Sequence, residues 1–173
     1  MFRTSVRDGI CASIAPMNQP FAFMDDATLN NCVTISAEGL SASLPELSSQ
    51  DGCLVRGSVP WVPGSASLAW TVAVAGKREG ACIGVRRVDV KNGDLQSNVV
   101  SVPNSDEVES SSWHAPPTVL HLELASAGGC TESRSELRWR LLNGPADKSA
   151  GTLRLPGDAA AWEPVVVRIR LKS

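Results

Sequence analysis

Hydrophobic and polar residues alternate in short runs beyond Pro20, and clusters of Gly, Pro, Asn, Asp and Ser separate the runs. Side chains on a β-strand point to opposite faces at successive residues, so period-two alternation indicates strands with one buried face. The clearest runs lie at 67–75, 119–124, 137–141 and 165–172. Helical periodicity is hard to find anywhere in the chain. The pattern therefore predicts antiparallel strands connected by turns.

Each run has one face of large apolar residues. In the last run, Val165 and Val167 are expected to face the core, while Arg168 and Arg170 are expected to face solvent. Further strands are predicted at 21–24, 32–36, 40–44, 53–57, 81–89, 98–102 and 152–155. Because every one-sided strand must cover its apolar face, these strands predict an all-β fold, an antiparallel two-sheet β-sandwich.

The length and composition indicate one globular domain, with 173 residues of which 43% are hydrophobic. We expect residues 1–19 to form an N-terminal extension and residues 20–173 to form the sandwich. Five cysteines without a C-x-x-C pair, and no N-glycosylation sequon, favour an intracellular and specifically cytoplasmic protein. Arg3 and Arg7 leave import into an organelle as the alternative. No apolar stretch approaches the length of about 20 residues that a membrane-spanning helix needs.

Several short blocks follow one another in a characteristic order. A Trp-bearing strand at 69–74 precedes a turn and the run Ile83-Gly84-Val85, and an Asn143-Gly144 turn follows a later strand. Gly84 suggests a place where a neighbouring backbone or a large ring approaches the strand closely. The blocks that carry the pattern are 32–42, 55–58, 69–74, 81–87, 136–144, 153–156 and 162–166. In this order they resemble the SPRY or B30.2 domain family, over roughly residues 20 to 172.

The resemblance implies a concanavalin-like jelly-roll sandwich that acts as a non-catalytic protein-interaction module or adaptor. In that family, loops at one end of the sandwich capture a partner peptide or a folded surface. The corresponding loops here would be 45–63, 91–112 and 144–151. The expected partners are proteins in a multi-subunit assembly, and no cofactor is implied.

Catalytic chemistry finds little support in the sequence. The chain has two histidines, and His121 falls on the polar face of its predicted strand. No nucleophile elbow, phosphate-binding loop, dinucleotide fingerprint or zinc-binding helix motif occurs. The cysteines are too widely scattered for a zinc site, and those in apolar runs are typical of small buried hydrophobic residues. We therefore expect no enzyme and no metal site.

Basic residues are concentrated near the C-terminus. Residues 134–173 hold eight Lys or Arg and four Asp or Glu, out of 16 and 18 in the whole chain. If their strands share one sheet, Arg138, Arg140, Arg168 and Arg170 would form a basic stripe for a partner. Such a stripe suggests, as an alternative function, a structural component of a ribonucleoprotein or cytoskeletal assembly. A carbohydrate-binding sandwich is a further alternative.

Trp61 is the remaining candidate for partner binding. It lies between Pro60 and Pro63 with Val62 beside it. An aromatic residue in this setting either anchors a partner from an exposed position or plugs the end of the sandwich.

Overall fold

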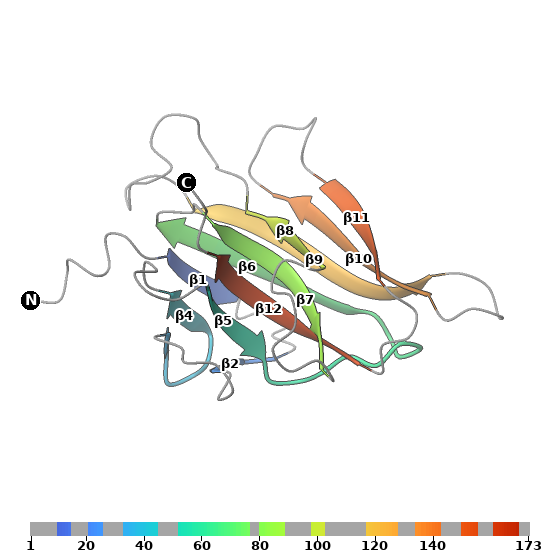
Figure 1. Ribbon diagram of the computed structural model, residues 1–173, viewed down its shortest axis with the longest axis horizontal. Helices are drawn as coiled ribbons and strands as arrows, with labels where there is room; N and C mark the ends of the chain where they lie inside the picture. Colours follow the sequence, from blue (N-terminus) through green and yellow to red (C-terminus); the bar gives the residue numbers. More distant parts are fainter. Residues whose placement is uncertain are drawn as a thin grey trace, which may run out of the picture.

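The computed structural model describes residues 10–14, 21–25, 33–44, 52–76, 80–88, 98–102, 117–127, 134–142, 150–155 and 161–169. These residues form two antiparallel sheets that pack face to face (Figure 1). The predicted all-β sandwich is thereby confirmed. No helix among these residues has the length and apolar character needed to cross a membrane.

The larger sheet has seven strands, drawn from residues between 10 and 155. Its strands are β1 (Ile10–Ile14), β3 (Thr34–Ile35), β4 (Ser41–Leu44), β6 (Leu68–Gly76), β9 (Thr118–Ala127), β10 (Arg134–Leu141) and β11 (Ala150–Leu155). They lie in the order β11-β10-β9-β6-β1-β4-β3. The long neighbours β6, β9 and β10 thus form one half of this sheet.

The smaller sheet covers the inner face of the larger one. Its strands are β2 (Phe23–Asp25), β5 (Gly52–Gly57), β7 (Ala81–Arg87), β8 (Val99–Ser101) and β12 (Trp162–Ile169). They lie in the order β2-β5-β12-β7-β8, so the last strand of the described chain is central. The strands predicted between residues 21 and 172 all have a counterpart among β2 to β12.

The core between the sheets is built from the faces that the alternation predicts. Leu120, Leu122 and Leu124 of β9 are each 0% exposed, and Trp70 and Val72 of β6 pack with them. Burying one such side chain contributes roughly 1.5 to 3 kcal/mol. Along β9, period-two alternation therefore determines which side chains enter the core.

The N-terminal segment corrects an expectation. Residues 10–14 were expected in an extension outside the sandwich, but they form β1, between β4 and β6 in the larger sheet. Ile10, Ala12 and Ile14 are buried in the core. The strand is short, and its small residues Ala12 and Ser13 give little alternation for the sequence pattern to reveal.

The faces of β12 also differ from the expectation. Val166 packs in the main core and Arg168 is buried, whereas Val165 and Val167 form a second apolar cluster with Leu54 and Cys82. Both faces of this central strand are therefore covered. The uninterrupted apolar run around Val166 carries no period-two signal, so its register could not be read from the sequence.

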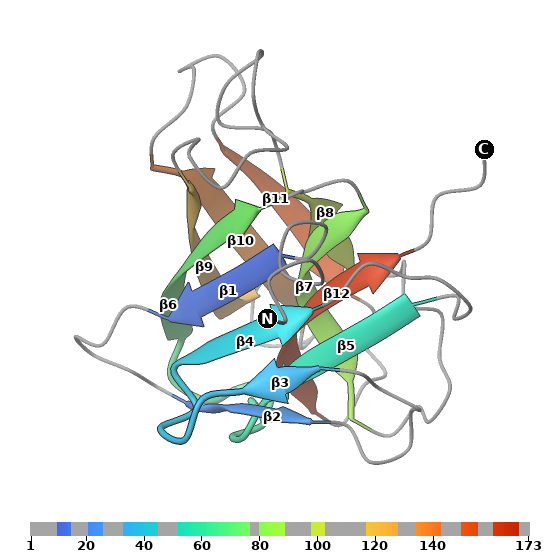
Figure 2. The ribbon, with the colours of Figure 1, turned by 90° about the vertical axis from the view of Figure 1, so that its left-hand side faces the viewer.

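The two sheets approach each other along one edge. The Phe23 amide of β2 donates to the carbonyl of Gly39, in the turn between β3 and β4, at 2.7 Å. Gly39 has a φ of 72°, in the left-handed region that favours glycine. Figure 2 shows β2 and β3 side by side at this edge. The hydrogen bond thus joins β2 of the smaller sheet to the β3–β4 turn of the larger sheet.

Two glycines permit close approaches inside the fold. A Cβ on Gly84 would lie 2.6 Å from the Cα of Val99 and would also meet the carbonyl oxygen of Asn98. The prediction of a neighbouring backbone at Gly84 is confirmed. A large ring instead approaches Gly151, where a Cβ would lie 2.7 Å from two atoms of the Trp139 indole.

We expect Gly84→Ala to lower the free energy of unfolding by about 1–3 kcal/mol, because the added methyl group overlaps backbone atoms of β8. Urea unfolding of the variant and of the wild-type protein measures this difference. Ser67→Ala, at an exposed position just before β6, is the control and should change stability by less than about 0.5 kcal/mol. Equal stability of Gly84→Ala and wild type would contradict the close packing of β7 and β8.

Candidate interaction surface

Trp61 lies in the segment that joins β5 to β6, and its side chain is 4% exposed. Its indole Nε1 donates to the Ala66 carbonyl at 2.8 Å, and its ring packs in the main core. The interpretation of Trp61 as a plug is confirmed, and the exposed-anchor alternative is wrong. A buried indole with its N–H satisfied holds the segment that surrounds it.

The backbone of Trp61 also pairs with the first residue of β12. The Trp61 amide donates to the Trp162 carbonyl at 2.7 Å, and the Trp162 amide donates to the Trp61 carbonyl at 2.8 Å. Directly paired residues of antiparallel chains place their side chains on the same face. Trp162 is 0% exposed, so both indoles point into the core.

A bulge separates this bridge from the regular part of β5. Arg56 pairs with Val165 and Trp61 pairs with Trp162, so five residue steps on one chain oppose three on the other. Ser58 remains attached to β2, because its amide donates to the Ala22 carbonyl at 2.8 Å and its hydroxyl accepts from the Ala22 amide at 3.0 Å. Val59 and Pro60, which follow, are exposed. The extra residues thus protrude between two fixed points.

A row of small and branched apolar residues crosses the end of the smaller sheet. Val62 follows Trp61 and Ala161 precedes Trp162, so both residues adjoin the isolated Trp61–Trp162 bridge. On the other side, the Val88 amide donates to the Ala161 carbonyl at 3.1 Å. The exposed fractions of Val62 and Val88 are 50% and 43%, and that of Val59 in the bulge is 49%. We call Val59, Val62, Val88 and Ala161 the valine end.

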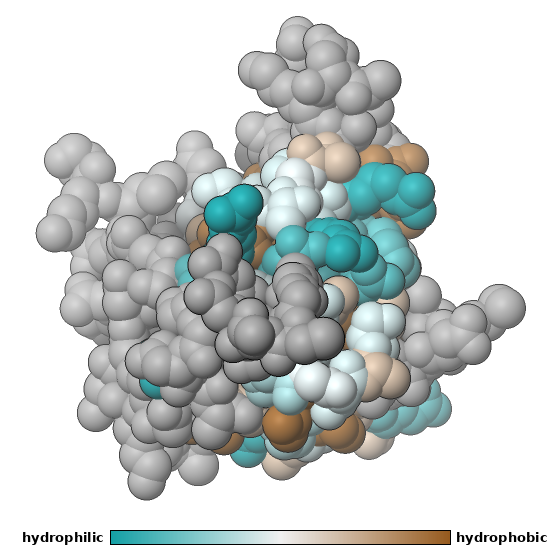
Figure 3. Space-filling model, turned by 90° about the vertical axis from the view of Figure 1, so that its right-hand side faces the viewer, coloured by the Kyte–Doolittle hydropathy of each residue, from teal (hydrophilic) through white to brown (hydrophobic). Residues whose placement is uncertain are grey.

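The valine end holds most of the exposed large hydrophobic residues in the described part of the chain. The others are Met24 and Leu142. Leu142 belongs to the opposite end of the sandwich, since its amide bonds to the Val119 carbonyl at the start of β9. On the side of the molecule shown in Figure 3, small hydrophobic patches lie at the lower edge and at the upper right. Of the exposed large hydrophobic residues among the described ones, three are thus the valines of the valine end.

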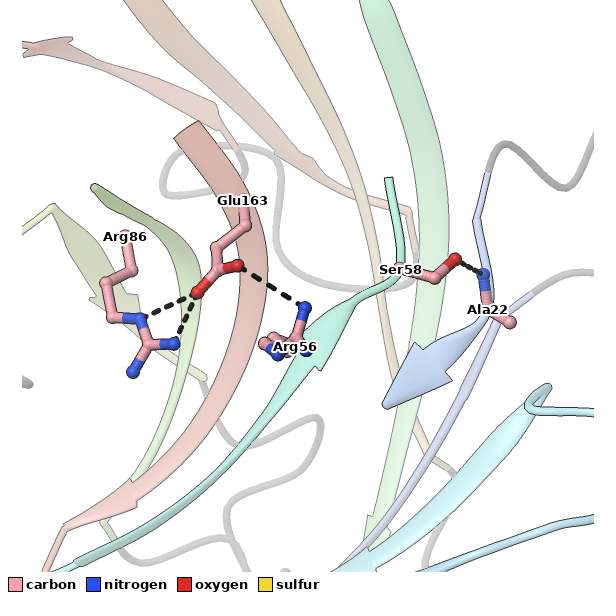
Figure 4. Close-up of polar contacts among 5 residues, drawn as sticks. All are labelled: Ala22, Arg56, Ser58, Arg86 and Glu163. Carbon is pink, nitrogen blue, oxygen red and sulfur yellow. Dashed lines mark hydrogen bonds and ion pairs between the residues drawn. The ribbon is translucent and has the colours of Figure 1, made fainter. Parts of the chain in front are cut away.

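A charged cluster lies beside the valine end, on the outer face of the smaller sheet (Figure 4). Arg86 of β7 donates from Nε to Glu163 Oε1 at 2.9 Å, and its Nη2 also pairs with this oxygen. Arg56 of β5 places Nη1 3.8 Å from Glu163 Oε2. The Glu163 side chain is 7% exposed, against 16% for Arg86 and 29% for Arg56. A nearly buried carboxylate thus lies between two arginines.

The predicted basic stripe is not formed. Arg138 and Arg140 lie on β10 of the larger sheet, whereas Arg168 lies on β12 of the smaller one. Arg168 is 4% exposed, and its Nη1 donates to the Leu44 carbonyl of the larger sheet at 3.4 Å. Arg170 lies outside the described residues. Arg168 therefore connects the two sheets and presents no charge to a partner.

The exposed arginines of β10 have acidic neighbours. Arg138 donates from Nε to Glu136 at 2.6 Å and from Nη1 to Glu123 at 3.1 Å. The hydrogen bond to Glu136, followed by the charge of this residue, raises the pKa of Arg138. Arg140 is exposed beside His121 in the strand register. This face carries mixed charges, which weakens its attraction for phosphate groups.

The remaining candidates for chemistry are a histidine on β9 and two buried cysteines. His121 lies on the outer face of β9, and its Nδ1 is 3.0 Å from the Thr71 hydroxyl. Cys53 and Cys82 are buried, and burial raises the pKa of the Cys82 thiol, which a hydrogen bond with Ser101 partly offsets. Within the described ranges, no group of three His, Cys, Asp or Glu side chains could hold a metal ion.

The expected binding loops coincide only in part with the surface found here. Residues 52–57 are β5, residues 99–101 are β8 and residues 150–151 belong to β11, so parts of all three predicted loops are strands. Residues 45–51, 91–97, 103–112 and 144–149 of these loops lie outside the part of the chain that the structure describes. Sequence reasoning missed the Arg56–Glu163–Arg86 cluster because Glu163 lies 77 residues beyond Arg86 in the chain. Arg56 and Arg86 come from neighbouring regions of the chain, but Glu163 joins them only through the pairing of β12 with β5 and β7.

Arg168 is buried and Arg140 is exposed, so replacing them is expected to change the stability of the protein by different amounts. We expect Arg168→Ala to lower the free energy of unfolding by about 1–3 kcal/mol, because the buried Leu44 carbonyl loses a donor. Arg140→Ala removes an exposed arginine and should change stability by less than about 0.5 kcal/mol. Chemical denaturation of both variants gives the comparison. Equal losses would show that Arg168 does not connect the sheets.

No family model matches the chain, and no curated protein matches it either. The resemblance to the SPRY or B30.2 family therefore stays a prediction from the sequence.

Proposed function

We propose that the protein is a non-catalytic protein-interaction module that binds a partner protein at the valine end, as a subunit or adaptor of a larger assembly. The observation that carries this proposal is the position of the exposed Val62 and Val88 beside the hydrogen-bonded start of β12, with the exposed Val59 in the adjoining bulge. Single exposed apolar residues are normal on protein surfaces, but grouped ones mark interaction sites.

The backbone beneath these valines supports the proposal. Val62 follows Trp61, which is fixed by the bridge to Trp162, and Val88 is bonded to Ala161. A surface on such paired backbone loses little conformational freedom when a partner binds, and this favours affinity. Membership of a larger assembly is also part of this proposal, and it rests on the resemblance to the SPRY or B30.2 family.

The valine end can be tested by introducing charge. We expect Val62→Asp combined with Val88→Asp to reduce the recovery of specific partners at least about tenfold, because burying an unpaired carboxylate in an interface is costly. The tagged full chain and its variants are used for affinity purification from the cells of origin, and partners are measured by quantitative mass spectrometry.

Leu142→Asp is the matched control. It places the same charge on a similarly exposed hydrophobic residue, 47% exposed, at the opposite end of the sandwich. Partners should be retained by this variant, and both proteins should keep the thermal midpoint of the wild type within a few degrees. Partners that tolerate both valine substitutions, or that are lost equally with Leu142→Asp, would argue against binding at the valine end.

A further inference from the structure

We propose that β11 pairs with β11 of a second copy of the chain, antiparallel and with the two Thr152 residues opposite each other, so that two larger sheets join into one. This inference goes beyond the proposed function and does not depend on it. It follows from the length of this edge strand, from the direction of its backbone groups and from the sizes of its side chains.

β11 is the longest edge strand in the part of the chain that the structure describes. The larger sheet ends in β11 and β3, and the smaller sheet ends in β2 and β8 (Figure 1). β11 has six residues, whereas β2 and β8 have three each and β3 has two. Short length, charges and prolines protect edge strands from pairing with another chain. β11 contains no proline and only one charged residue, Arg154, so it has little of this protection.

The hydrogen bonds of the sheet show which backbone groups of β11 point to its outer edge. The amide of Leu142, just after β10, donates to the Val119 carbonyl at 2.8 Å, and the two residues are opposite each other in the β9–β10 register. In an antiparallel sheet, successive residues of a strand bond alternately to its two neighbours. Trp139 therefore bonds to β11, where Gly151 lies opposite it. The next residue of β11, Thr152, directs its amide and carbonyl to the outer edge.

Three residues of β11 offer backbone groups at this edge, namely Ala150, Thr152 and Arg154. Among the described residues, no strand pairs with β11 on this side. With the two Thr152 residues opposite each other, Ala150 of each copy lies opposite Arg154 of the other. Each of these pairs can exchange two hydrogen bonds. A register centred on Leu153 would leave Ala150 without an opposite strand residue, so the register centred on Thr152 forms the most bonds.

The side chains on the outer face of β11 fit this register. Ala150, Thr152 and Arg154 are exposed. Opposite threonines stabilise a pair of strands, whereas like charges directly opposite each other destabilise it. A register centred on Arg154 would set two arginines opposite each other. In the proposed register, each arginine instead lies opposite the small side chain of Ala150.

The side chains on the inner face are complementary in size. Leu153 of one copy lies opposite Gly151 of the other, and a Cβ on Gly151 would lie 2.7 Å from two atoms of the Trp139 indole. Trp139 and Leu153 pack against the core but are only partly buried. The position without a side chain thus brings Leu153 of the second copy beside the Trp139 ring. Both residues lose exposed apolar surface, which stabilises the dimer.

The valine end takes no part in this contact, because none of its residues lies on β10 or β11. A dimer formed through β11 therefore carries two valine ends. Two linked binding surfaces hold a partner with two binding segments more tightly than one surface does, without any new contact.

Sedimentation velocity of the full chain tests the dimer at concentrations of about 1 to 100 μM, the range in which small interfaces dissociate. We expect the weight-average sedimentation coefficient to rise with concentration from the monomer toward the dimer. Thr152→Pro removes an amide that points to the outer edge, so the bonds between β10 and β11 are kept and the centre of the dimer is lost. The dissociation constant should rise at least about tenfold, with the thermal midpoint within a few degrees of the wild type. Thr152→Val keeps the amide and should still dimerise.

Cross-linking tests the register. Thr152→Cys should form a disulfide between two copies under mild oxidation, because the Cα atoms of a hydrogen-bonded pair lie about 5.5 Å apart. Arg154→Cys is the matched control, since it lies on the same strand and the same face. Its two copies would be about 13 Å apart along the strands and should not cross-link. Peptide mapping by mass spectrometry separates these disulfides from any formed by the native cysteines.

A protein that stays monomeric over the whole concentration range would overturn the inference. A dimer that survives Thr152→Pro, or that cross-links equally through Arg154→Cys, would overturn the pairing at β11. A dimer that is lost with Val62→Asp and Val88→Asp but kept with Thr152→Pro would place the contact at the valine end instead. A monomer that loses its partners with Thr152→Pro would show that this edge takes a strand of another protein, which also overturns the inference. The proposed function is judged separately, by the recovery of partners with the valine variants.

Discussion

The surface of this protein depends on the bridge between Trp61 and Trp162. Their backbones exchange two hydrogen bonds, and both indoles lie in the core between the sheets. Because each ring is large and nearly or completely buried, moving either residue would open a cavity at this end of the sandwich. The bridge therefore fixes the register at which β12 begins and the path by which the chain enters β6. The exposure of Val62 is a consequence of the burial of Trp61, its neighbour.

The central position of β12 explains why charges occur where alternation would not place them. Its two faces are both covered, by the main core around Val166 and by the second cluster around Val165 and Val167. A strand buried on both faces accommodates polar residues only at its ends or where they are paired. Glu163, near the start of β12, is paired with Arg86, and Arg168, near its end, donates to the opposite sheet. The ends of the strand thus carry its charges, and only the start lies beside exposed apolar residues.

The sequence predicts most strands of this fold but few features of the candidate surface. Leu120, Leu122 and Leu124 alternate with polar residues, so their strand and its buried face are both readable. In β12 the successive valines remove the alternation, and the core-facing residues were assigned to the wrong face. In β1 the small residues give too little alternation to predict a strand. Trp61 shows another limit of prediction from the sequence. The two prolines around it indicate an irregular segment, but they do not indicate which side chain is buried.

The bulge at residues 58–60 connects these observations to binding. A regular continuation of β5 would pair Val59 with Trp162, since the extra residues change the pairing by two positions. The insertion therefore brings Trp61 to Trp162 and places Val62 next to this bridge, while Ser58 stays attached to Ala22. Glu163 pairs closely with Arg86, whereas Arg56 lies farther from it and is the more exposed of the two arginines. Apolar alignment and charge are thus set by different elements that meet at the start of β12, so each can change without loss of the other.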